Sequence, residues 1–494
     1  MSALKIAIGP CRFEKGRSII SVIASSLVKI VHELVPEYGI AIFGSRLDQF
    51  DEWPFSLYMD HIDIKGFQLQ KTGTGTIQGM IEYAYQGQKI CDDMCRSLQG
   101  YDVIVVERDP THFHPVSAFA FYFFVQWCLK NDPSKRIIFR MYDILREPEK
   151  IFKPHDLSSE ILLISDWRSI FYPLAPNVSY IAGSSVKYRE LASLGIDRAR
   201  IHYLPACLDV CSEETSKRDL RTELESRFNI AFDARIIFSS VKCVPENNVE
   251  EAILITVLLN HLRKQYELLE DYGDTDKPFH LVVAQTGTDE NEAYSRAVRE
   301  FVRDNNLPVT IGVEDLIAFG EAGDGIEEKY SLADMYVACR MAITTAMSEK
   351  NPYIYLEPWL YDCLLIGRDN PVATVDFKQV GGMKLGHLYD ILRVGDIDFV
   401  RMGENHPVRF PFSIIEPSSF NEEKLNFVSE MDKNEKVRNA FLNQNEIQMK
   451  RLICLLAEGR FAELIIHNKK AVKKTYSSET VLLQLRDILI KHEV

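Results

Sequence analysis

The sequence of 494 residues lacks an apolar stretch long enough to cross a lipid bilayer. Its longest apolar run, Val116 to Leu129, has about 14 residues, whereas a membrane-spanning helix needs roughly 20. It also shows no signal-peptide pattern at its start, because a strand-like run from Leu4 to Ile8 begins almost at once. These absences favour a cytoplasmic protein with no integral membrane segment.

Basic residues are fewer than acidic ones, 57 against 71. The net charge of −14 argues against nucleic acid or an anionic membrane as the main partner. Nearly all of the acidic excess lies after residue 210, so the first part of the chain is almost neutral, which favours a small soluble acceptor over one in a membrane.

Paired cysteine motifs are missing as well. The ten cysteines form no C-x-x-C pair, which favours buried, reduced thiols and no structural metal. The glycine-rich segment 71–76 lacks the terminal Gly-Lys-Ser/Thr of a P-loop. No repeat and no low-complexity tract appears.

What the sequence does contain is a regular alternation of short apolar runs and helical patterns. In the first part, strand-like runs are followed by segments with apolar residues at helical spacing, which predicts a parallel, doubly wound sheet. The predicted strands are Leu4–Gly9, Tyr38–Phe43, Tyr101–Val106, Arg136–Met141, Val178–Ile181 and Ile201–Leu204, and the predicted helices are Ser18–Leu34, Gln78–Leu98, Val116–Leu129 and Ser184–Leu194.

The alternation stops in a polar stretch and then starts again. The second series runs from a strand at Ala234–Ser239 to a strand at Leu364–Ile366, with a helix expected across Ile354–Tyr361. We therefore expect an α/β protein with two Rossmann-like domains facing each other across a cleft, the ligand lying at the carboxyl ends of the strands. The predicted domains are 1–210, a linker 211–233, a second domain 234–470 and a C-terminal helix 471–494.

Three segments of the second part carry a resemblance to a known family. They are Phe238–Val249, with Lys242 after a strand and Pro245-Glu-Asn-Asn before a helix; Tyr330-Ser-Leu-Ala-Asp334; and Glu349–Gly367, with Glu349 and Glu357 eight positions apart. Together they resemble the family-4-type retaining glycosyltransferases of the GT-B fold, the group that includes glycogen-synthase-like and sucrose-synthase-like enzymes. The resemblance implies transfer of a hexose from a UDP- or GDP-sugar to a small polar or carbohydrate acceptor, without a required metal or other cofactor. It also implies a C-terminal helix that crosses back to the first domain; packing on its own domain is the alternative.

The resemblance assigns donor-site roles in the second domain. Glu349 would lie on the sugar side as a catalytic residue, and Glu357 would hold the ribose hydroxyls. Lys242 would carry the diphosphate charge, since Asn247 stands where the family has a second cation. Lys350, Asn351 and Tyr353 complete the expected donor site. Solvated surface roles for Lys242 and the two glutamates are the alternatives.

The first domain offers two further groups. Gly9 and Arg12 lie in a loop between the first strand and a helix, a position that favours anions, although a plain surface loop fits equally. The family's His-Asp loop appears here as Tyr142-Asp143, and Asp143 is expected to be catalytic. Arg140, Arg146 and Asp109 are expected to bind the acceptor, because arginine suits carboxylate and hydroxyl partners. A structural ion pair is the alternative for these arginines.

Two other functions stay open. A relative of the same fold could act as a phosphorylase or an epimerase, or it could bind a sugar nucleotide as a non-catalytic regulator. The loss of the second phosphate cation at Asn247 favours the regulator. Homo-oligomerisation is compatible with the sequence and not specified by it.

Overall fold

The chain divides into two compact units, Met1–Cys207 with Ser478–Val494, and Leu208–Ser477. Each is built around a parallel sheet with flanking helices, which confirms the predicted α/β class with two doubly wound sheets. The computed structural model describes residues 5–12, 39–45, 62–66, 80–108, 115–141, 144, 167–208, 217–268, 277–287, 291–318, 330–347, 352–394, 410–411 and 422–490. The helix predicted at Ser18–Leu34 lies outside these ranges.

The sheet of the first unit has seven parallel strands in the order β3-β2-β1-β4-β5-β6-β7. Successive strands are added on one side of β1 and then on the other, so the strand order reverses between β1 and β4. The strands are β1 (Lys5–Arg12), β2 (Gly39–Ser45), β3 (Ile62–Gly66), β4 (Val103–Arg108), β5 (Arg136–Met141), β6 (Val178–Ala182) and β7 (Ile201–Tyr203).

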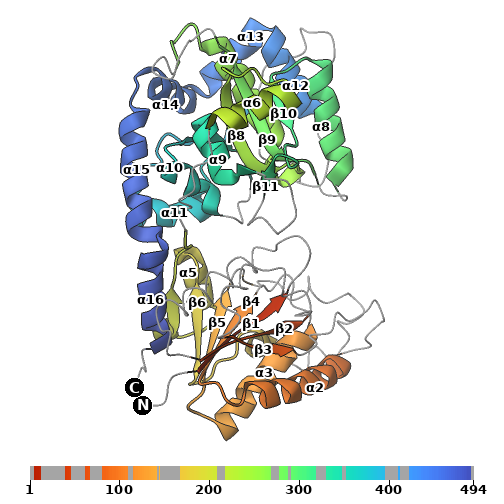
Figure 1. The fold of residues 1–494 in the computed structure, drawn as a ribbon, viewed down its shortest axis with the longest axis vertical. Helices are drawn as coiled ribbons and strands as arrows, with labels where there is room; N and C mark the ends of the chain where they lie inside the picture. Colours follow the sequence, from red (N-terminus) through yellow and green to blue (C-terminus); the bar gives the residue numbers. More distant parts are fainter. Residues whose placement is uncertain are drawn as a thin grey trace. The chain divides into compact units, whose positions relative to one another are not determined.

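Helices α2 (Met80–Leu98) and α3 (Pro115–Asn131) lie side by side against this sheet (Figure 1). Helix α3 is apolar on nearly all sides and is therefore largely buried, as an all-round apolar helix must be. The remaining helical segments of the unit are α4 (Trp167–Phe171), α5 (Ser185–Ser193), the 3₁₀ turn η6 (Arg198–Arg200) and α16 (Ser478–Ile490).

The last helix belongs to the first unit although it ends the chain. The Arg136 guanidinium at the start of β5 donates to the carbonyls of Ile488 and Leu489, at 2.7 and 2.6 Å. A cation at a helix C-terminus satisfies free carbonyls and interacts favourably with the helix dipole. These bonds fix the end of α16 to the sheet.

The sheet of the second unit has five parallel strands in the order β10-β9-β8-β13-β14. Its order reverses between β8 and β13, the point at which open α/β sheets bind ligands. The strands are β8 (Arg235–Lys242), β9 (Phe279–Gln285), β10 (Val309–Ile311), β13 (Met341–Thr344) and β14 (Leu364–Gly367), with two short pairs besides, β11 (Ile317–Ala318) with β12 (Tyr330–Ser331) and β15 (Arg393–Val394) with β16 (Phe410–Pro411).

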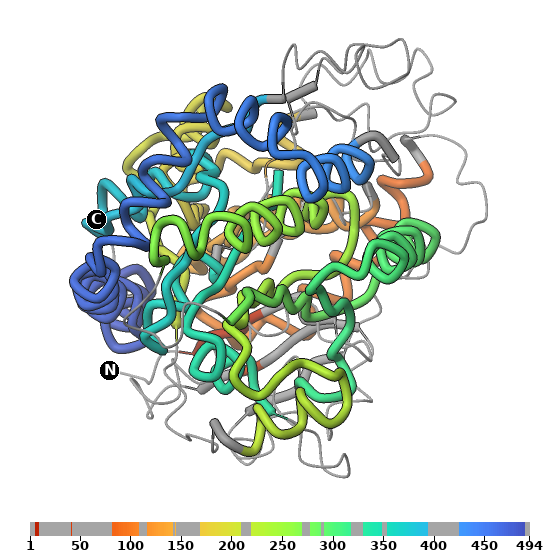
Figure 2. The backbone as a smooth tube through the Cα atoms, turned by 90° about the horizontal axis from the view of Figure 1, so that it is seen from above, coloured from red at the N-terminus to blue at the C-terminus, as the bar shows by residue number. Residues whose placement is uncertain are grey.

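Helix α7 (Val249–Leu262) is the central helix of this unit, and nearly all its side chains are buried. Helix α12 (Glu422–Lys433) runs alongside it, as Figure 2 shows. The other helical segments are α6 (Lys217–Phe228), η7 (Pro245–Asn247), α8 (Glu292–Asp304), α9 (Leu332–Cys339), η10 (Pro352–Tyr355), α10 (Glu357–Leu360), α11 (Pro371–Gln379), α13 (Glu435–Gln444), α14 (Glu446–Ala457) and α15 (Phe461–Tyr476).

Two predicted segments differ in the structure. Residues 211–233 were expected to form a linker, but their helix α6 is packed in the second unit because Arg221 donates to the carbonyls of Ala338 and Ala234, at 2.6 Å each. The helix expected across Ile354–Tyr361 is split into η10 and the short α10. Pro358 lies in the first turn of α10, and since proline has no N–H to bond to a preceding turn, the helix begins immediately before it.

Candidate functional site

At the carboxyl edge of the second unit's sheet, the segments that follow β8 and β13 are hydrogen-bonded to each other. The strand order reverses between these two strands. After β13, the Met347 N–H donates to the carbonyl of Glu246, which follows β8, at 3.0 Å. The buried Thr345 hydroxyl lies 3.0 Å from the carbonyls of both Asn247 and Asn248. The segments after the two strands are therefore held together as one wall.

A buried network of charged and polar side chains holds this wall in place. The Glu251 carboxylate, in the first turn of α7, accepts from Arg368 at 2.5 Å, Asn248 at 2.7 Å and Tyr389 at 2.8 Å. Lys424 of α12 donates to the Asn248 side-chain oxygen at 2.8 Å. A buried carboxylate with a paired guanidinium and two further donors avoids the cost of an isolated buried charge. The network fixes Asn248, whose φ of 49° gives the chain its left-handed turn into α7.

Close packing at the same edge requires a glycine at the end of β14. Gly367 has a φ of 113°, and a Cβ there would lie 2.0 Å from the carbonyl oxygen of Thr344 on the neighbouring strand. Only glycine tolerates both the backbone conformation and this approach. Arg368 comes directly after Gly367, so the backbone turn at Gly367 positions the Arg368 side chain for its ion pair with Glu251.

Lys242 lies at the end of β8 with its side chain exposed, immediately before the joined wall. The strand is irregular between Ser239 and Lys242, which shifts its register against β9. The Asn247 side-chain amide, predicted to contact the donor, donates instead to the Lys242 carbonyl at 2.8 Å. Asn247 thus closes the loop behind Lys242, and the lysine ammonium is left at the sheet edge.

Glu357 lies half-buried at the start of α10, beside a tyrosine of α9. The Tyr336 hydroxyl is 3.0 Å from the Ser240 hydroxyl of β8 and 3.5 Å from a Glu357 carboxylate oxygen. The Tyr336 ring stacks on Tyr361, with centroids 6.1 Å apart. Side chains from β8, α9 and α10 therefore converge at one point.

This environment changes the ionisation of Glu357. Burial disfavours the charged carboxylate and raises its pKa from the ordinary 4.5 to about 7, against the opposing effect of the hydrogen bond from Tyr336. Burial likewise raises the pKa of Tyr336 well above its ordinary value, so that side chain stays a neutral donor at physiological pH. The site thus holds a carboxyl group poised near neutrality, as ligand-binding and catalytic sites often do.

Several predicted donor residues have no described geometry. Tyr353 lies half-buried in η10, four positions before Glu357. Glu349, Lys350 and Asn351 lie outside the described residues, so the pairing of Glu349 with Glu357 stays a prediction.

In the first unit the described part of the predicted site is an ion pair. Arg140 near the end of β5 lies beside Glu107 of β4 as a register neighbour, and its guanidinium is 3.7 Å from the buried Glu107 carboxylate. This agrees with the structural alternative for Arg140, while its acceptor role stays a prediction. The loop expected from Gly9 to Arg12 is wrong, because both residues belong to β1, where Gly9 is paired with Val106 and Arg12 with Ser45. Asp109, Asp143, Arg146 and the side chain of Arg12 lie outside the described residues.

Within the described ranges, no three His, Cys, Asp or Glu side chains gather where a metal ion could bind. None of the helices in those ranges is long and apolar enough to cross a membrane.

The sequence analysis missed Tyr336, Ser240 and the Glu251–Arg368 pair. Tyr336 and Glu357 are 21 positions apart, with a complete strand between them, and Glu251 and Arg368 are 117 apart. One signal was present: α7 is apolar on all sides after its first turn, which predicts a fully buried helix. Acidic residues at the start of such a helix must be buried as well, and so must be paired.

Comparison with known proteins finds the same fold and no close relative. No family model matches the chain. No curated protein matches it either. Among solved structures, a glycosyltransferase from Rickettsia africae has a TM-score of 0.53 at 10% identity, with all of both chains covered. Alr3699/HepE of Anabaena, solved in complex with UDP and glucose, has a TM-score of 0.51 at 12% identity, covering 98% of this chain and 99% of its own. The chain therefore has the α/β architecture of these GT-B proteins.

Proposed function

We propose that the protein is a glycosyltransferase that moves a hexose from a UDP- or GDP-sugar to a small polar or carbohydrate acceptor, with retention at the sugar carbon. The observation that carries the proposal is the meeting of Ser240, Tyr336 and Glu357 beside the reversal point of the second sheet. Lys242 is exposed at the end of the same strand as Ser240. The fold shared with Alr3699/HepE, solved with UDP and glucose, supports a nucleotide-sugar ligand at such an edge.

The diphosphate would be held at Lys242. Its exposed ammonium follows a parallel strand at the edge where ligands of open α/β sheets bind. When the glycosidic bond to phosphate breaks, negative charge grows on the leaving oxygen, and a fixed cation stabilises that charge. The buried network under Asn248 keeps the loop behind Lys242 in place, so the cation needs little rearrangement.

Glu357 would accept hydrogen bonds from the ribose hydroxyls. The ionised carboxylate is the stronger acceptor, so hydroxyl donors would stabilise it and lower its raised pKa towards the usual range. Glu349 on the sugar side and Asp143 in the first domain would be catalytic, as the resemblance implies. Arg140, Arg146 and Asp109 would bind the acceptor.

The test is incubation of the full chain with a panel of nucleotide sugars, following release of UDP or GDP. Lys242→Ala should weaken donor binding roughly tenfold to a hundredfold, since a charge-assisted hydrogen bond contributes about 1.5–3 kcal/mol. Lys436→Ala, which removes an exposed lysine of α13, is the matched control and should bind the donor normally. Full donor affinity in both Lys242→Ala and Glu357→Ala would disprove the site.

A second candidate is a non-catalytic sugar-nucleotide-binding protein. It is favoured by Asn247, which stands where the resemblance expects a cation and uses its amide within the loop. Donor binding with no release of UDP or GDP in the presence of varied acceptors would favour this candidate. Turnover with any acceptor would exclude it.

A further inference from the structure

Two free thiols of the first unit lie next to each other on α2. Cys91 and Cys95 are four positions apart, and their sulfur atoms are 3.8 Å apart in hydrogen-bond contact. Residues at this spacing share one face of a helix. Cys91 is buried, with 1% of its surface exposed, whereas Cys95 is half-buried. The pair therefore has one side chain closed to solvent and one that is partly open to it.

The core supports the helical geometry of this part of α2. One turn before Cys91, α2 crosses α3 so closely that a Cβ at Gly87 would lie 2.6 Å from the Cβ of Phe119. Only glycine allows such an approach. Cys95 itself packs against the buried core of the unit. The two sulfur atoms are therefore presented from a fixed turn of helix.

This fixed geometry does not suit a disulfide bond between the two thiols. Residues four apart on a helix have Cβ atoms about 5–6 Å apart. A disulfide needs Cβ atoms about 3.5–4.5 Å apart. Direct bonding of Cys91 to Cys95 would thus require the helix to distort where it is packed on α3.

A single atom placed between the sulfurs fits the spacing without such a distortion. If it bonds each sulfur at roughly 2.3 Å, the length of a zinc–thiolate bond, it spans sulfurs about 3.5–4 Å apart. Zinc itself takes four ligands. Among the residues that the structure describes, no third His, Cys, Asp or Glu side chain completes such a set. The bridging atom must therefore need only two thiolates, as trivalent arsenic does when it already carries an organic group.

The hydrogen bond between the thiols also prepares the more accessible one for reaction. It is the main cause that lowers the pKa of Cys95, against the opposing effect of burial, and it raises the pKa of Cys91. The thiolate is the reactive form of cysteine. Cys95 is thus the sulfur that reacts first, and Cys91 is the neighbour that closes the bridge.

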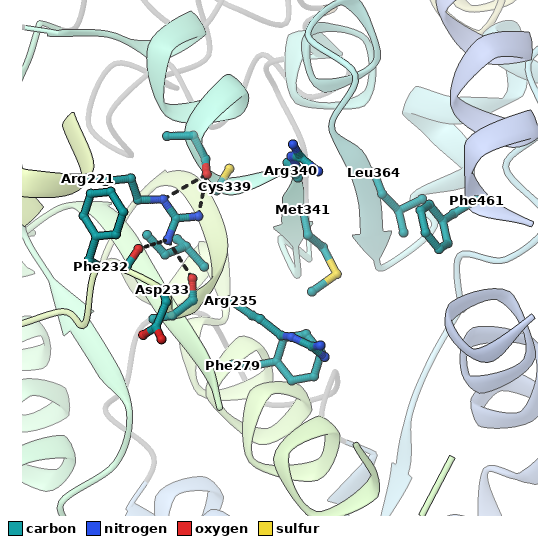
Figure 3. A pocket seen from close by; sticks show the side chains of 13 residues that line it. Arg221, Phe232, Asp233, Arg235, Phe279, Cys339, Arg340, Met341, Leu364 and Phe461 are labelled. Carbon is teal, nitrogen blue, oxygen red and sulfur yellow. Dashed lines mark hydrogen bonds between the residues drawn. The ribbon is translucent and has the colours of Figure 1, made fainter. Parts of the chain in front are cut away.

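A second pair of cysteines has nearly the same spacing but is closed. The sulfurs of Cys339 and Cys363 are 4.0 Å apart in the second unit. Cys339 lines a cavity of about 550 Å³ at the amino edge of the sheet, where β8, β9, β13 and β14 begin (Figure 3). Its exposed fraction is only 5%, however, and that of Cys363 is 0%. Spacing alone does not make a site, and the half-buried Cys95 is what distinguishes the pair on α2.

We propose that Cys91 and Cys95 form a dithiol site that binds an organic trivalent arsenical, with the arsenic atom bridging the two sulfurs. The site lies within the first unit and does not depend on the proposed function.

The reaction with an arsenoxide is balanced without an oxidant or a reductant. Cys95 forms the first arsenic–sulfur bond, and Cys91 forms the second. The arsenic–oxygen double bond breaks, and the two thiol protons leave with the oxygen as one molecule of water. Arsenic stays trivalent, and its organic group keeps the third position.

The probe is phenylarsine oxide, added in equimolar amount to the reduced full chain and followed by intact-mass spectrometry. Peptide mapping after treatment with iodoacetamide locates the protected thiols. We expect one phenylarsenic group per chain, with Cys91 and Cys95 both protected. The adduct should survive an excess of 2-mercaptoethanol and be removed by 2,3-dimercaptopropanol, because the second bond to the protein is intramolecular and only another dithiol matches that advantage.

Cys95→Ser should keep the fold, since Cys95 is half-buried, and should retain the arsenical roughly a hundredfold more weakly against 2-mercaptoethanol. Cys91→Ala, which keeps a small apolar side chain in the core, should have the same effect. Cys454→Ser, which removes a half-buried thiol of α14, is the matched control and should behave as wild type.

Equal retention by wild type and Cys95→Ser would overturn the proposal. Removal of the adduct from wild type by 2-mercaptoethanol would also overturn it, because only one sulfur would then be bonded. So would protection of Cys339 and Cys363 in place of the pair on α2. These outcomes are read without any nucleotide sugar, so they leave the test of the proposed function untouched.

Discussion

The two edges of the second unit's sheet use buried arginines in opposite ways. At the carboxyl edge, Arg368 is paired with the Glu251 carboxylate inside a buried network. At the amino edge, Arg221 and Arg235 donate hydrogen bonds to backbone carbonyls, those of Ala338 and Leu268 among them. The carboxyl edge is thus held through a buried carboxylate, and the amino edge through arginine bonds to the backbone.

The largest expected effect tests the carboxyl-edge network. Glu251→Ala leaves Arg368 buried without its counter-charge and also removes the acceptor for Asn248 and Tyr389. Breaking one side of a buried ion pair costs about 3–5 kcal/mol, measured as the free energy of unfolding in urea. Glu246→Ala, an exposed glutamate five positions earlier, should change it by no more than about 0.5 kcal/mol.

Arg221→Ala removes the arginine that bonds to backbone carbonyls at the amino edge. It should cost less, about 1–3 kcal/mol, because neutral carbonyls rather than a buried charge are left behind. An Arg221→Ala cost equal to or above that of Glu251→Ala would contradict the contrast drawn between the two edges.

The next prediction concerns pH and Glu357. Its pKa is raised from 4.5 to about 7 in the folded chain, so the folded state binds more protons than the unfolded state between those values. Stability must then fall as the pH rises from about 4.5 to about 7 and level off above, with a total loss of about 3 kcal/mol from this group. Glu357→Gln removes the titration. It should match wild type near pH 4.5 and be more stable than wild type at pH 8, in urea unfolding at fixed ionic strength.

If the free energies of unfolding of wild type and Glu357→Gln differ by the same amount from pH 4.5 to pH 8, the raised pKa of Glu357 is contradicted. Binding of UDP-glucose, which carries no phosphate monoester that titrates near neutrality, should tighten over the same pH range in wild type and not in Glu357→Gln.

The smallest predicted effect belongs to Arg340, the residue between α9 and β13. Because its φ of 61° is costly for a residue with a Cβ, Arg340→Gly should raise the free energy of unfolding by about 1 kcal/mol. Arg340→Ala keeps the Cβ and should give no such gain. A loss of stability in Arg340→Gly would mean that the guanidinium has a structural role.

The sequence predicted the parts of the molecule that depend on local pattern. The strand predicted at Ala234–Ser239 is β8, which continues three residues further to Lys242, because a run of apolar residues marks a buried strand better than it marks the strand's end. The contacts that define the site were not readable. Tyr336 and Glu357 are separated in the sequence by the whole of β13 and come into contact only in the folded sheet. The bond of Arg368 to Glu251 depends on the backbone turn at Gly367.

The amino-edge cavity could not be predicted for a related reason. Arg221, Arg235 and Arg340 come from a helix, a strand start and a turn, and each alone resembles a surface arginine. The role of Arg221 was missed because residues 211–233 were expected to be a linker. Arg221 fixes α6 through the Ala338 carbonyl, which is 117 positions away in the sequence.

The most direct test of the central claim is hydrogen exchange of the full chain with and without its preferred nucleotide sugar. Ligand binding at the carboxyl edge should slow exchange in 239–248 and 353–361, while 232–236 and 338–341 at the amino edge keep their rates. Protection at the amino edge alone, or at neither edge at saturating ligand, would contradict the assignment of the donor site to Lys242 and Glu357.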